Sequence, residues 1–132
     1  MLGIETRLPL LFSEGVMKGR IDLSRFVALS ATNAAKIYGL YPRKGTLAIG
    51  ADADIAIWDP KREVTITKSI LHDRMDYTPY EGMKVTGWPV TTLSRGEAVW
   101  DGGKVLGRPG RGQFLARSRF PATAGAEHHA RA

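Results

Sequence analysis

The feature that most constrains this sequence is an abrupt change of pattern between residues 30–40 and residues 44–59. The first stretch, SATNAAKIYGL, is rich in alanine and ends in a glycine-containing turn, which is typical of a short helix. The second, KGTLAIGADADIAIWD, places glycines ahead of a nearly continuous apolar run, which is typical of a buried strand. A chain patterned first for helices and afterwards for strands is expected to fold as an α+β protein.

The first helix is expected within residues 4–17, where apolar side chains recur at the spacing of one helix face. Proline is tolerated only in the first turn of a helix, so Pro9 places the start near Thr6. Gly15 and Gly19 bracket its expected end.

Two further short helices are expected before residue 40. Asp22 has the side chain of an N-cap and precedes a second apolar group. A third helix is expected to begin at a cap supplied by Ser30 or Thr32, and Gly39 follows it in the position of a left-handed C-cap residue. The side chains that this third helix would turn toward the core are Ala34, Ile37 and Tyr38.

Extended segments are expected after a boundary near residues 41–46. The first strand should end before Pro60, because proline lacks the N–H that a sheet ladder needs. A glycine-bearing turn at residues 101–103 predicts a terminal hairpin. The expected strands are 55–58, 64–67, 83–88 and 90–94, followed by the hairpin of 97–100 with 104–105.

The composition is that of one modest globular domain. The chain has 132 residues, of which 43% are apolar, and no run approaches the roughly 18 apolar residues of a membrane-spanning helix. It begins without the basic-then-apolar pattern of a signal peptide, and it contains no cysteine. We therefore expect a cytoplasmic protein without disulfides, thiolate chemistry or membrane contact.

Most of the net charge of +6 lies after residue 101, where six bases stand against the single acid Glu127. The bases are Lys104, Arg108, Arg111, Arg117, Arg119 and Arg131. No zinc-finger, recognition-helix or RNA-binding-sheet pattern accompanies them. The basic region is therefore expected to be a solvated extension or a contact onto an acidic surface, and no nucleic-acid partner is expected.

The paired acids Asp52 and Asp54 are the first candidates for chemistry. Because they lie two residues apart on an extended segment, both side chains project to one face, as carboxylates that bind metal or share a proton would. Glycine precedes them and an apolar strand follows, however, and this setting favours turn formation and strand capping. We expect a structural role for both residues.

The histidines argue against a metal centre in this chain. A hydrolytic zinc site takes three protein ligands, and a two-metal site takes more. The sequence holds His72 and the adjacent His128 and His129, without H-x-H or H-E-x-x-H spacing. It also lacks a G-x-S-x-G motif, and residues 107–112 lack the Gly-Lys-Ser/Thr ending of a phosphate loop. We therefore predict no catalytic, cofactor-binding or metal-binding residue here.

Residues 71–82, LHDRMDYTPYEG, form a charged loop that contains two tyrosines. Pro79 fixes an extended bend, and Tyr77 and Tyr80 can each bury a ring while the hydroxyl stays hydrogen-bonded. Two roles are consistent with this composition: docking on a neighbouring element, or a contact at a domain or subunit boundary. Both remain open at the level of sequence.

Six segments carry a more specific pattern. They are Gly3-Ile-Glu-Thr-Arg-Leu-Pro-Leu-Leu, Thr32-Asn-Ala-Ala-Lys, Lys44-Gly45, Gly50-Ala-Asp-Ala-Asp-Ile55, Asp76-Tyr-Thr-Pro-Tyr-Glu-Gly82 and Gly87-Trp-Pro-Val90. Together they resemble the C-terminal portion of the dihydropyrimidinase and D-hydantoinase branch of the amidohydrolase superfamily. Many amidohydrolases share the acidic block, whereas the first segment and the tyrosine loop are much narrower signatures. The resemblance covers about residues 3–115.

This resemblance implies a fold and a division of the chain. Residues 1–42 would be the last helices of a (β/α)8 amidohydrolase barrel. Residues 43–115 would be the C-terminal part of a small β-sandwich domain, and residues 116–132 a disordered tail.

The resemblance also implies a reaction. Enzymes of this branch hydrolyse the cyclic amide of dihydropyrimidines or 5-substituted hydantoins to N-carbamoyl amino acids. Two zinc ions, held by four histidines, a carboxylated lysine and an aspartate, activate the attacking water. All of those ligands belong to the barrel ahead of the part that this chain resembles, and a substrate-contacting asparagine would fall just before Gly3. No catalytic residue is carried over to this chain.

Two hypotheses follow. In the first, the chain is the C-terminal fragment of a zinc-dependent cyclic amidohydrolase and is inactive alone. Its partners are then the missing N-terminal barrel part or sister subunits of a homo-oligomer. In the second, it is a non-catalytic interaction or oligomerisation module derived from the same family. Restoration of hydantoin or dihydrouracil hydrolysis by the barrel part would separate them.

The apolar stripes of the helical region predict poor solubility of the isolated chain. Residues 4–17 and 22–38 would present faces that, in the family, lie against a barrel, and exposed apolar patches of that kind promote association. Light scattering should therefore detect oligomers or aggregates. A monomeric sample that melts cooperatively would count against the fragment hypothesis.

Overall fold

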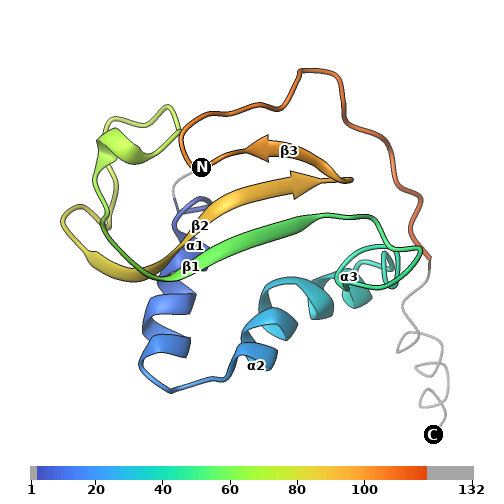
Figure 1. The fold of residues 1–132 in the computed structure, drawn as a ribbon, viewed down its shortest axis with the longest axis horizontal. Coiled ribbons are helices and arrows are strands. Elements are labelled where there is room, and N and C mark those ends of the chain that lie inside the picture. The colour runs from blue at the N-terminus through green and yellow to red at the C-terminus, as the bar shows by residue number, and fades with distance from the viewer. Residues whose placement is uncertain (1–2, 119–132) are drawn as a thin grey trace, which may run out of the picture.

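The computed structural model describes residues 3–118 and has two layers, one of helices and one formed by an antiparallel sheet (Figure 1). The helical segments come first, in blue and cyan, and three strands follow, in green to orange. The expected α+β order is therefore confirmed. The helices end at Ile37 and the first strand begins at Ile55, on either side of the expected boundary.

The first helix consists of α1 (Arg7–Leu11), which continues directly into the π-helical η1 (Phe12–Met17). The start expected near Thr6 is confirmed, and Pro9 lies buried in the first turn, where its missing N–H does no harm. Gly19 follows the last turn with a φ of +67°. Among the described residues there is no helix that could span a bilayer.

The second helical segment runs from α2 (Leu23–Val27) through η2 (Ala28–Thr32) to α3 (Asn33–Ile37). Asp22 caps its start as expected, because a carboxylate oxygen accepts the backbone N–H of Arg25 at 2.6 Å. The two expected short helices are thus one continuous helix.

The caps expected for a separate third helix are wrong. Ser30 and Thr32 lie inside the helix, where the backbone N–H groups already have partners. Their hydroxyls bond elsewhere: Ser30 donates to the carbonyl of Phe26 at 2.7 Å, and Thr32 donates to the carbonyl of Gly45 at 2.7 Å. Gly39 ends the helix as expected, with a φ of +67°.

The inward face expected for α3 is also wrong. Ile37 and Tyr38 are 59% and 62% exposed and Ala34 is only partly buried, whereas Ala35 is buried. The reason lies in the turn that follows the helix. A Cβ atom added at Gly45 would lie 2.5 Å from the Cβ of Ala35, so this turn packs directly onto the alanine and selects it as the inner residue.

The sheet is antiparallel and has the strand order β1-β2-β3. The strands are β1 (Ile55–Thr65), β2 (Lys84–Ser94) and β3 (Glu97–Trp100), and a short 3-10 turn, η3 (Lys68–Ile70), follows β1. The expected terminal hairpin is confirmed by the antiparallel bridge between Trp100 and Val105.

The strand end expected at Pro60 is wrong. Pro60 lies inside β1 and Pro89 lies inside β2, so in each case two expected strands are one. The register shifts at both places, between Asp59 and Glu63 and next to the Trp58 partner of Pro89. Irregular pairing of this kind accommodates a residue that has no N–H to donate.

The two layers meet at the aromatic ring of Phe12. Its ring stacks on Trp58 with centroids 5.2 Å apart and meets Phe26 edge-on at 5.4 Å. Gly87 permits this approach, because a Cβ atom there would lie 2.2 Å from the Phe12 ring. A second buried cluster lies between the sheet and the β1–β2 connection, and its members are Ile66, Leu71, Val85 and Trp88.

After β3 the chain runs past the sheet and returns to the end of the helical layer (Figure 1). The N–H of Leu106 donates to the carbonyl of Val99 at 2.9 Å, and the N–H of Ser118 donates to the carbonyl of Gly39 at 2.8 Å. We call residues 105–118 the C-terminal strap. It joins the last strand to the C-terminal end of α3.

Several sequence-based predictions are not settled by these residues. The tail expected at residues 116–132 is described only as far as Ser118, and His128 and His129 lie outside the described residues. The division into 1–42 and 43–115 stays a prediction.

Replacing Gly87 by alanine should separate the two layers. The new Cβ would collide with the Phe12 ring and would also require an alanine at a φ of +94°, so we expect a loss of about 3 kcal/mol in the free energy of unfolding. Gly96→Ala is the matched control, because Gly96 has a similar φ of +80° but open space around it, and should cost about 1 kcal/mol. Urea unfolding followed by tryptophan fluorescence measures both; equal losses would show that the Phe12 contact is not tight.

Candidate functional site

The aspartates singled out by the sequence meet one lysine at the junction between helices and sheet. Lys44 Nζ lies 2.9 Å from an oxygen of Asp52 and also pairs with Asp54. Arg43 adds a second cation to Asp52 at 3.1 Å, and the backbone N–H of Arg95, in the β2–β3 turn, donates to Asp54 at 2.8 Å. We call Lys44, Asp52 and Asp54 the Lys44 cluster. It ties the end of the helical layer to the far end of the sheet.

The cluster favours the charged form of every member. The hydrogen bond from Lys44 lowers the pKa of Asp52 below its usual value of 3.8. Burial acts to raise the pKa of Asp54, but the bonds from Lys44 and from the Arg95 N–H outweigh it, so this pKa is also lowered. Burial opposes the charge of Lys44 as well, yet both carboxylates raise its pKa above 10.5. No member is poised to exchange protons near neutral pH.

A groove of about 310 Å³ lies beside the Lys44 cluster. Its walls are mainly apolar and come from the three helical elements α1, α2 and η2, from the turn after residue 44 and from the start of β1. The lining side chains include Val27, Ala31, Leu47, Ile55 and Ala56, and we call this the junction groove. The charges on its wall are compensated within the cluster, so the groove suits an uncharged apolar occupant.

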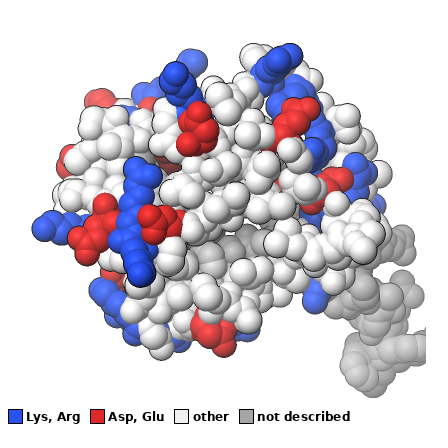
Figure 2. All heavy atoms as spheres, in the orientation of Figure 1, with Lys and Arg blue, Asp and Glu red and all other residues white. Residues whose placement is uncertain are grey.

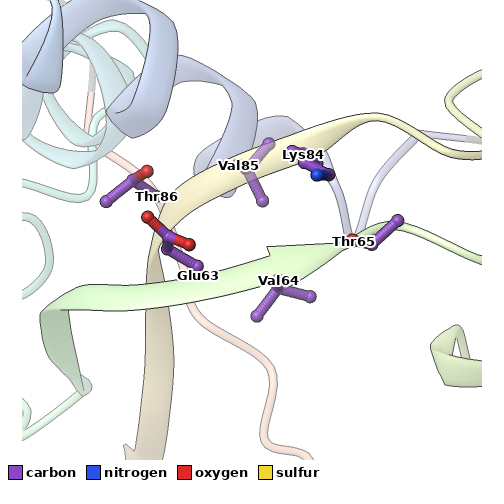
Figure 3. A pocket seen from close by; sticks show the side chains of 6 residues that line it. All are labelled: Glu63, Val64, Thr65, Lys84, Val85 and Thr86. Atoms are coloured by element: carbon purple, nitrogen blue, oxygen red, sulfur yellow. The ribbon is translucent and has the colours of Figure 1, made fainter.

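A second hollow lies between the paired ends of β1 and β2 (Figure 3). It has a volume of about 330 Å³ and is lined by residues 63–65 and 84–86. Glu63 and Lys84 bring opposite charges to it, beside valine and threonine side chains. This set contains no nucleophile with an adjacent base, so it offers sheet packing rather than catalysis.

The loop of residues 71–82 is docked on the start of the helical layer. One oxygen of Glu5 accepts the backbone N–H of His72 at 2.8 Å, and the other contacts the His72 imidazole nitrogen Nδ1 at 2.8 Å. The same imidazole meets the Trp100 ring edge-on at 5.0 Å. These contacts account for His72 as a structural residue. They show the loop on a neighbouring element and leave its role at a subunit boundary as a prediction.

Several charged side chains are paired within the molecule. Figure 2 shows small groups of both signs around one face, with uncharged surface between them. In the strap, Arg111 donates to the carbonyl of Ser94 at 2.8 Å and pairs with Glu97 at 3.0 Å. At least this part of the basic C-terminal region is therefore a contact onto the chain's own sheet.

The described residues do not fit a metal ion. Within residues 3–118 no three His, Cys, Asp or Glu side chains come together in a way that would hold one. Asp52 and Asp54 are close enough to act together, but Lys44 occupies the position between them that a cation would need. We therefore derive no chemical step through a metal from these residues.

Sequence reasoning placed the two aspartates correctly in a turn before a strand, but it missed their partners. Lys44 was noted only as part of a motif, and the Arg95 N–H comes from a turn far along the chain. It also missed the junction groove. The groove is lined by apolar residues that lie far apart in the sequence, such as Val27 and Leu47, and only the fold brings them together. These two side chains are 50% and 73% exposed.

The chain belongs to the amidohydrolase family, whose model matches residues 3–99. Within that family its relatives are hydantoinases and dihydropyrimidinases. It is 51% identical over 119 residues to a D-hydantoinase of Geobacillus stearothermophilus, covering 90% of this chain and 25% of the relative. The expected resemblance is confirmed.

Solved structures show the same relationship. A crystal structure of a D-hydantoinase matches with a TM-score of 0.82 at 50% identity, covering 84% of this chain and 24% of that one. The dihydropyrimidinase of Brevibacillus agri matches with a TM-score of 0.83 at 44% identity, covering 86% and 24%. The chain therefore spans about a quarter of the length of the relatives that it matches.

The Lys44 cluster should make stability fall at both extremes of pH. Because Asp52 and Asp54 have lowered pKa values in the fold, their contribution is present above 3.8 and is lost as the pH falls through the folded values. Because the pKa of Lys44 is raised, its contribution is present below 10.5 and is lost as the pH rises through the folded value. Lys44→Met should flatten both limbs of a plot of unfolding free energy against pH.

Lys18→Met is the matched control for this measurement, because it removes an exposed ion pair with Glu14 on the surface of η1. Its curve should keep the shape of the unmodified protein. If Lys44→Met also leaves both limbs unchanged, the cluster does not hold the junction together.

Proposed function

We propose that this chain supplies the C-terminal quarter of a cyclic amidohydrolase of the hydantoinase and dihydropyrimidinase type. The observation that carries the proposal is the close match, in both sequence and fold, to one quarter of such enzymes. The reaction would add water across the cyclic amide bond of a 5-substituted hydantoin or a dihydropyrimidine and release an N-carbamoyl amino acid. In this proposal the enzyme acts in the cytoplasm.

In this assignment the helices, residues 1–42, complete a (β/α)8 barrel, and residues 43–115 complete a small β-sandwich domain. The exposed apolar side chains of the helical layer support this proposal. Leu23 is 59% exposed, Val27 50% and Ile37 59%, which leaves apolar helix surface without cover in the described chain. A partner that covers these side chains, either the remaining part of the enzyme or a sister subunit, would remove the unfavourable exposure of this apolar surface to water.

This chain's contribution to catalysis would be indirect. Two zinc ions would supply the activation of water in the assembled enzyme, and the described residues of this chain do not fit as their ligands. Its own residues would hold the layers in register through Phe12 and the Lys44 cluster. A free-standing interaction module is the competing function, and the next experiment distinguishes the two.

A two-part reconstitution tests the proposal. The probe is the Geobacillus stearothermophilus D-hydantoinase without the segment that matches this chain, prepared with zinc and mixed with the 132-residue chain. Neither part alone should hydrolyse hydantoin or dihydrouracil, and the mixture should do so, because a relationship at 51% identity implies compatible packing surfaces. Release of the N-carbamoyl amino acid is followed by chromatography.

The control is the same truncated enzyme mixed with its own matching segment, which shows that the two-part format is active. If that control is active and this chain binds the truncated enzyme without restoring hydrolysis, the interaction-module function replaces the proposed one.

A further inference from the structure

The carboxylate of Glu5 holds the loop of residues 71–82 at a single residue, His72. One of its oxygens accepts the backbone N–H of His72 at 2.8 Å, and the other lies 2.8 Å from the imidazole nitrogen Nδ1. The Trp100 ring of β3 meets the same imidazole edge-on, with ring centroids 5.0 Å apart. His72 is therefore the point where the N-terminal segment, the loop and the last strand meet. We call Glu5, His72 and Trp100 the His72 latch.

The bond between the imidazole and Glu5 depends on where the imidazole carries its protons. A neutral imidazole has one N–H, so Nδ1 donates to the carboxylate in one of the two tautomers and faces it with a lone pair in the other. An imidazolium has an N–H on both nitrogens and donates in every case. The bond then joins opposite charges, which makes it stronger than a bond from a neutral donor. Protonation of His72 therefore strengthens the latch.

The imidazole can gain or lose a proton without any part of the fold opening. The side chain of His72 is 51% exposed. Within residues 3–118 no protein atom is hydrogen-bonded to its second nitrogen, Nε2, so this nitrogen exchanges its proton directly with water. Histidine is the side chain whose charge ordinarily changes between about pH 5 and pH 8. The latch therefore combines a titratable group, a fixed carboxylate and access to solvent.

The other charged groups on the elements that meet at the latch are engaged elsewhere or exposed to water. The engaged acids are Asp73, which pairs with Lys68, Glu97, which pairs with Arg111, and Asp101, which accepts the backbone N–H groups of Gly103 and Lys104. Arg7 of α1 and Arg74 and Asp76 of the loop are exposed, where salt screens their charges. Within the described part of the chain, Glu5 is thus the one charged group bonded to the imidazole.

The latch acts on a short part of the loop. Leu71 and Thr78 are 9% and 7% exposed and fix its two ends in the fold. Residues 72–77 between them are exposed or half-buried, and the Glu5 contact ties them to the N-terminal segment. A segment with few buried contacts opens locally at a small cost in free energy. Weakening of the latch therefore releases residues 72–77 and leaves the buried cluster around Leu71 intact.

We propose that the His72 latch is a pH-responsive device, which holds residues 72–77 more firmly when the imidazole is charged than when it is neutral. Its contribution is present at mildly acidic pH, where the imidazolium faces the ionised Glu5, and is lost as the pH rises and the imidazole gives up its proton. All three residues lie within this chain, so the device is independent of the proposed function and operates whether or not the chain is part of a larger enzyme.

Hydrogen exchange of the 132-residue chain tests the latch. Protection of the backbone amides of residues 72–77, corrected for intrinsic exchange rates, is compared at about pH 5.5 and about pH 8. It should fall about threefold toward the higher pH, which is the size of effect that an exposed ion pair gives. His72→Asn keeps a neutral donor at the position of Nδ1 but does not titrate, so its protection should change less than about 1.5-fold.

Two further variants isolate the carboxylate. Glu5→Gln keeps an oxygen that accepts the His72 N–H but removes the charge, so it should also lose the dependence on pH. Glu14→Gln is the matched control, because it removes an exposed carboxylate that pairs with Lys18 on η1, and should keep the full change. His128 and His129 are present in every variant, so any effect of their titration is common to all of them.

Trp100 supplies a second readout, because a charged imidazole quenches the fluorescence of an indole next to it. Emission should drop from the higher to the lower pH, and the drop should disappear in His72→Asn and in Trp100→Phe. Trp58 stacks on Phe12 and Trp88 belongs to the buried cluster, so both give the same background in these variants.

Equal dependence of protection on pH in the unmodified chain and in His72→Asn overturns the latch, and so does protection that rises with pH. A fluorescence drop that persists in His72→Asn means that another group titrates beside Trp100, and it also overturns the latch. Circular dichroism establishes that each variant is folded. If His72→Asn does not fold, Glu5→Gln decides: loss of the pH dependence there, with its retention in Glu14→Gln, supports the latch, and its retention in both overturns it.

Discussion

The contact between Phe12 and the backbone of Gly87 is the constraint on which the rest of the structure depends. The Phe12 ring reaches the sheet only because position 87 has no side chain, and from there it touches Trp58 of β1 and Phe26 of α2. The next residue of η1, Ser13, accepts the backbone N–H of Thr86, the residue before Gly87, at 3.1 Å. Adjacent residues of η1 thus supply an apolar and a polar contact to adjacent residues of β2.

Local signals in the sequence predicted the two outer ends of the second helical segment, although the internal caps expected at Ser30 and Thr32 are wrong. Asp22 and Gly39 act through their own side chain or backbone conformation, and both perform the expected capping role. The inner face of α3 was not predictable in the same way, because the turn at Gly45 decides it by packing on Ala35. The inner face depends on the path of the chain after the helix, and the spacing of apolar residues within the helix carries no information about that path.

The strands show the same division between local and distant causes. Pro60 indicates a strand end on local grounds, yet it lies within β1 at a place where the register shifts. Whether a missing N–H is costly depends on the partner strand. The candidate site also combines a local and a distant cause. The spacing of Asp52 and Asp54 predicted that they share a face, but Lys44 becomes their common partner only when the turn between Lys44 and Asp52 is folded.

In this chain the buried polar groups are almost all hydrogen-bonded, whereas part of the apolar surface is left uncovered, and this difference bears on its function. Within the described residues, Thr6 Oγ1 is the single buried side-chain polar atom without a hydrogen-bond partner. The Lys44 cluster, the loop of residues 71–82 and the C-terminal strap also make polar contacts within the chain. The surface that stays uncovered is apolar: the outer surface of the helices, the junction groove and the first residues of β1.

This combination of internally paired polar groups and uncovered apolar surface is expected of a part that folds locally and is completed by packing against another part. Packing between parts is mainly hydrophobic, and uncompensated buried charges would oppose it. The distribution therefore supports a structural share in a larger amidohydrolase, because a site that acted alone would need the reverse: covered apolar surface and polar groups left free for a substrate.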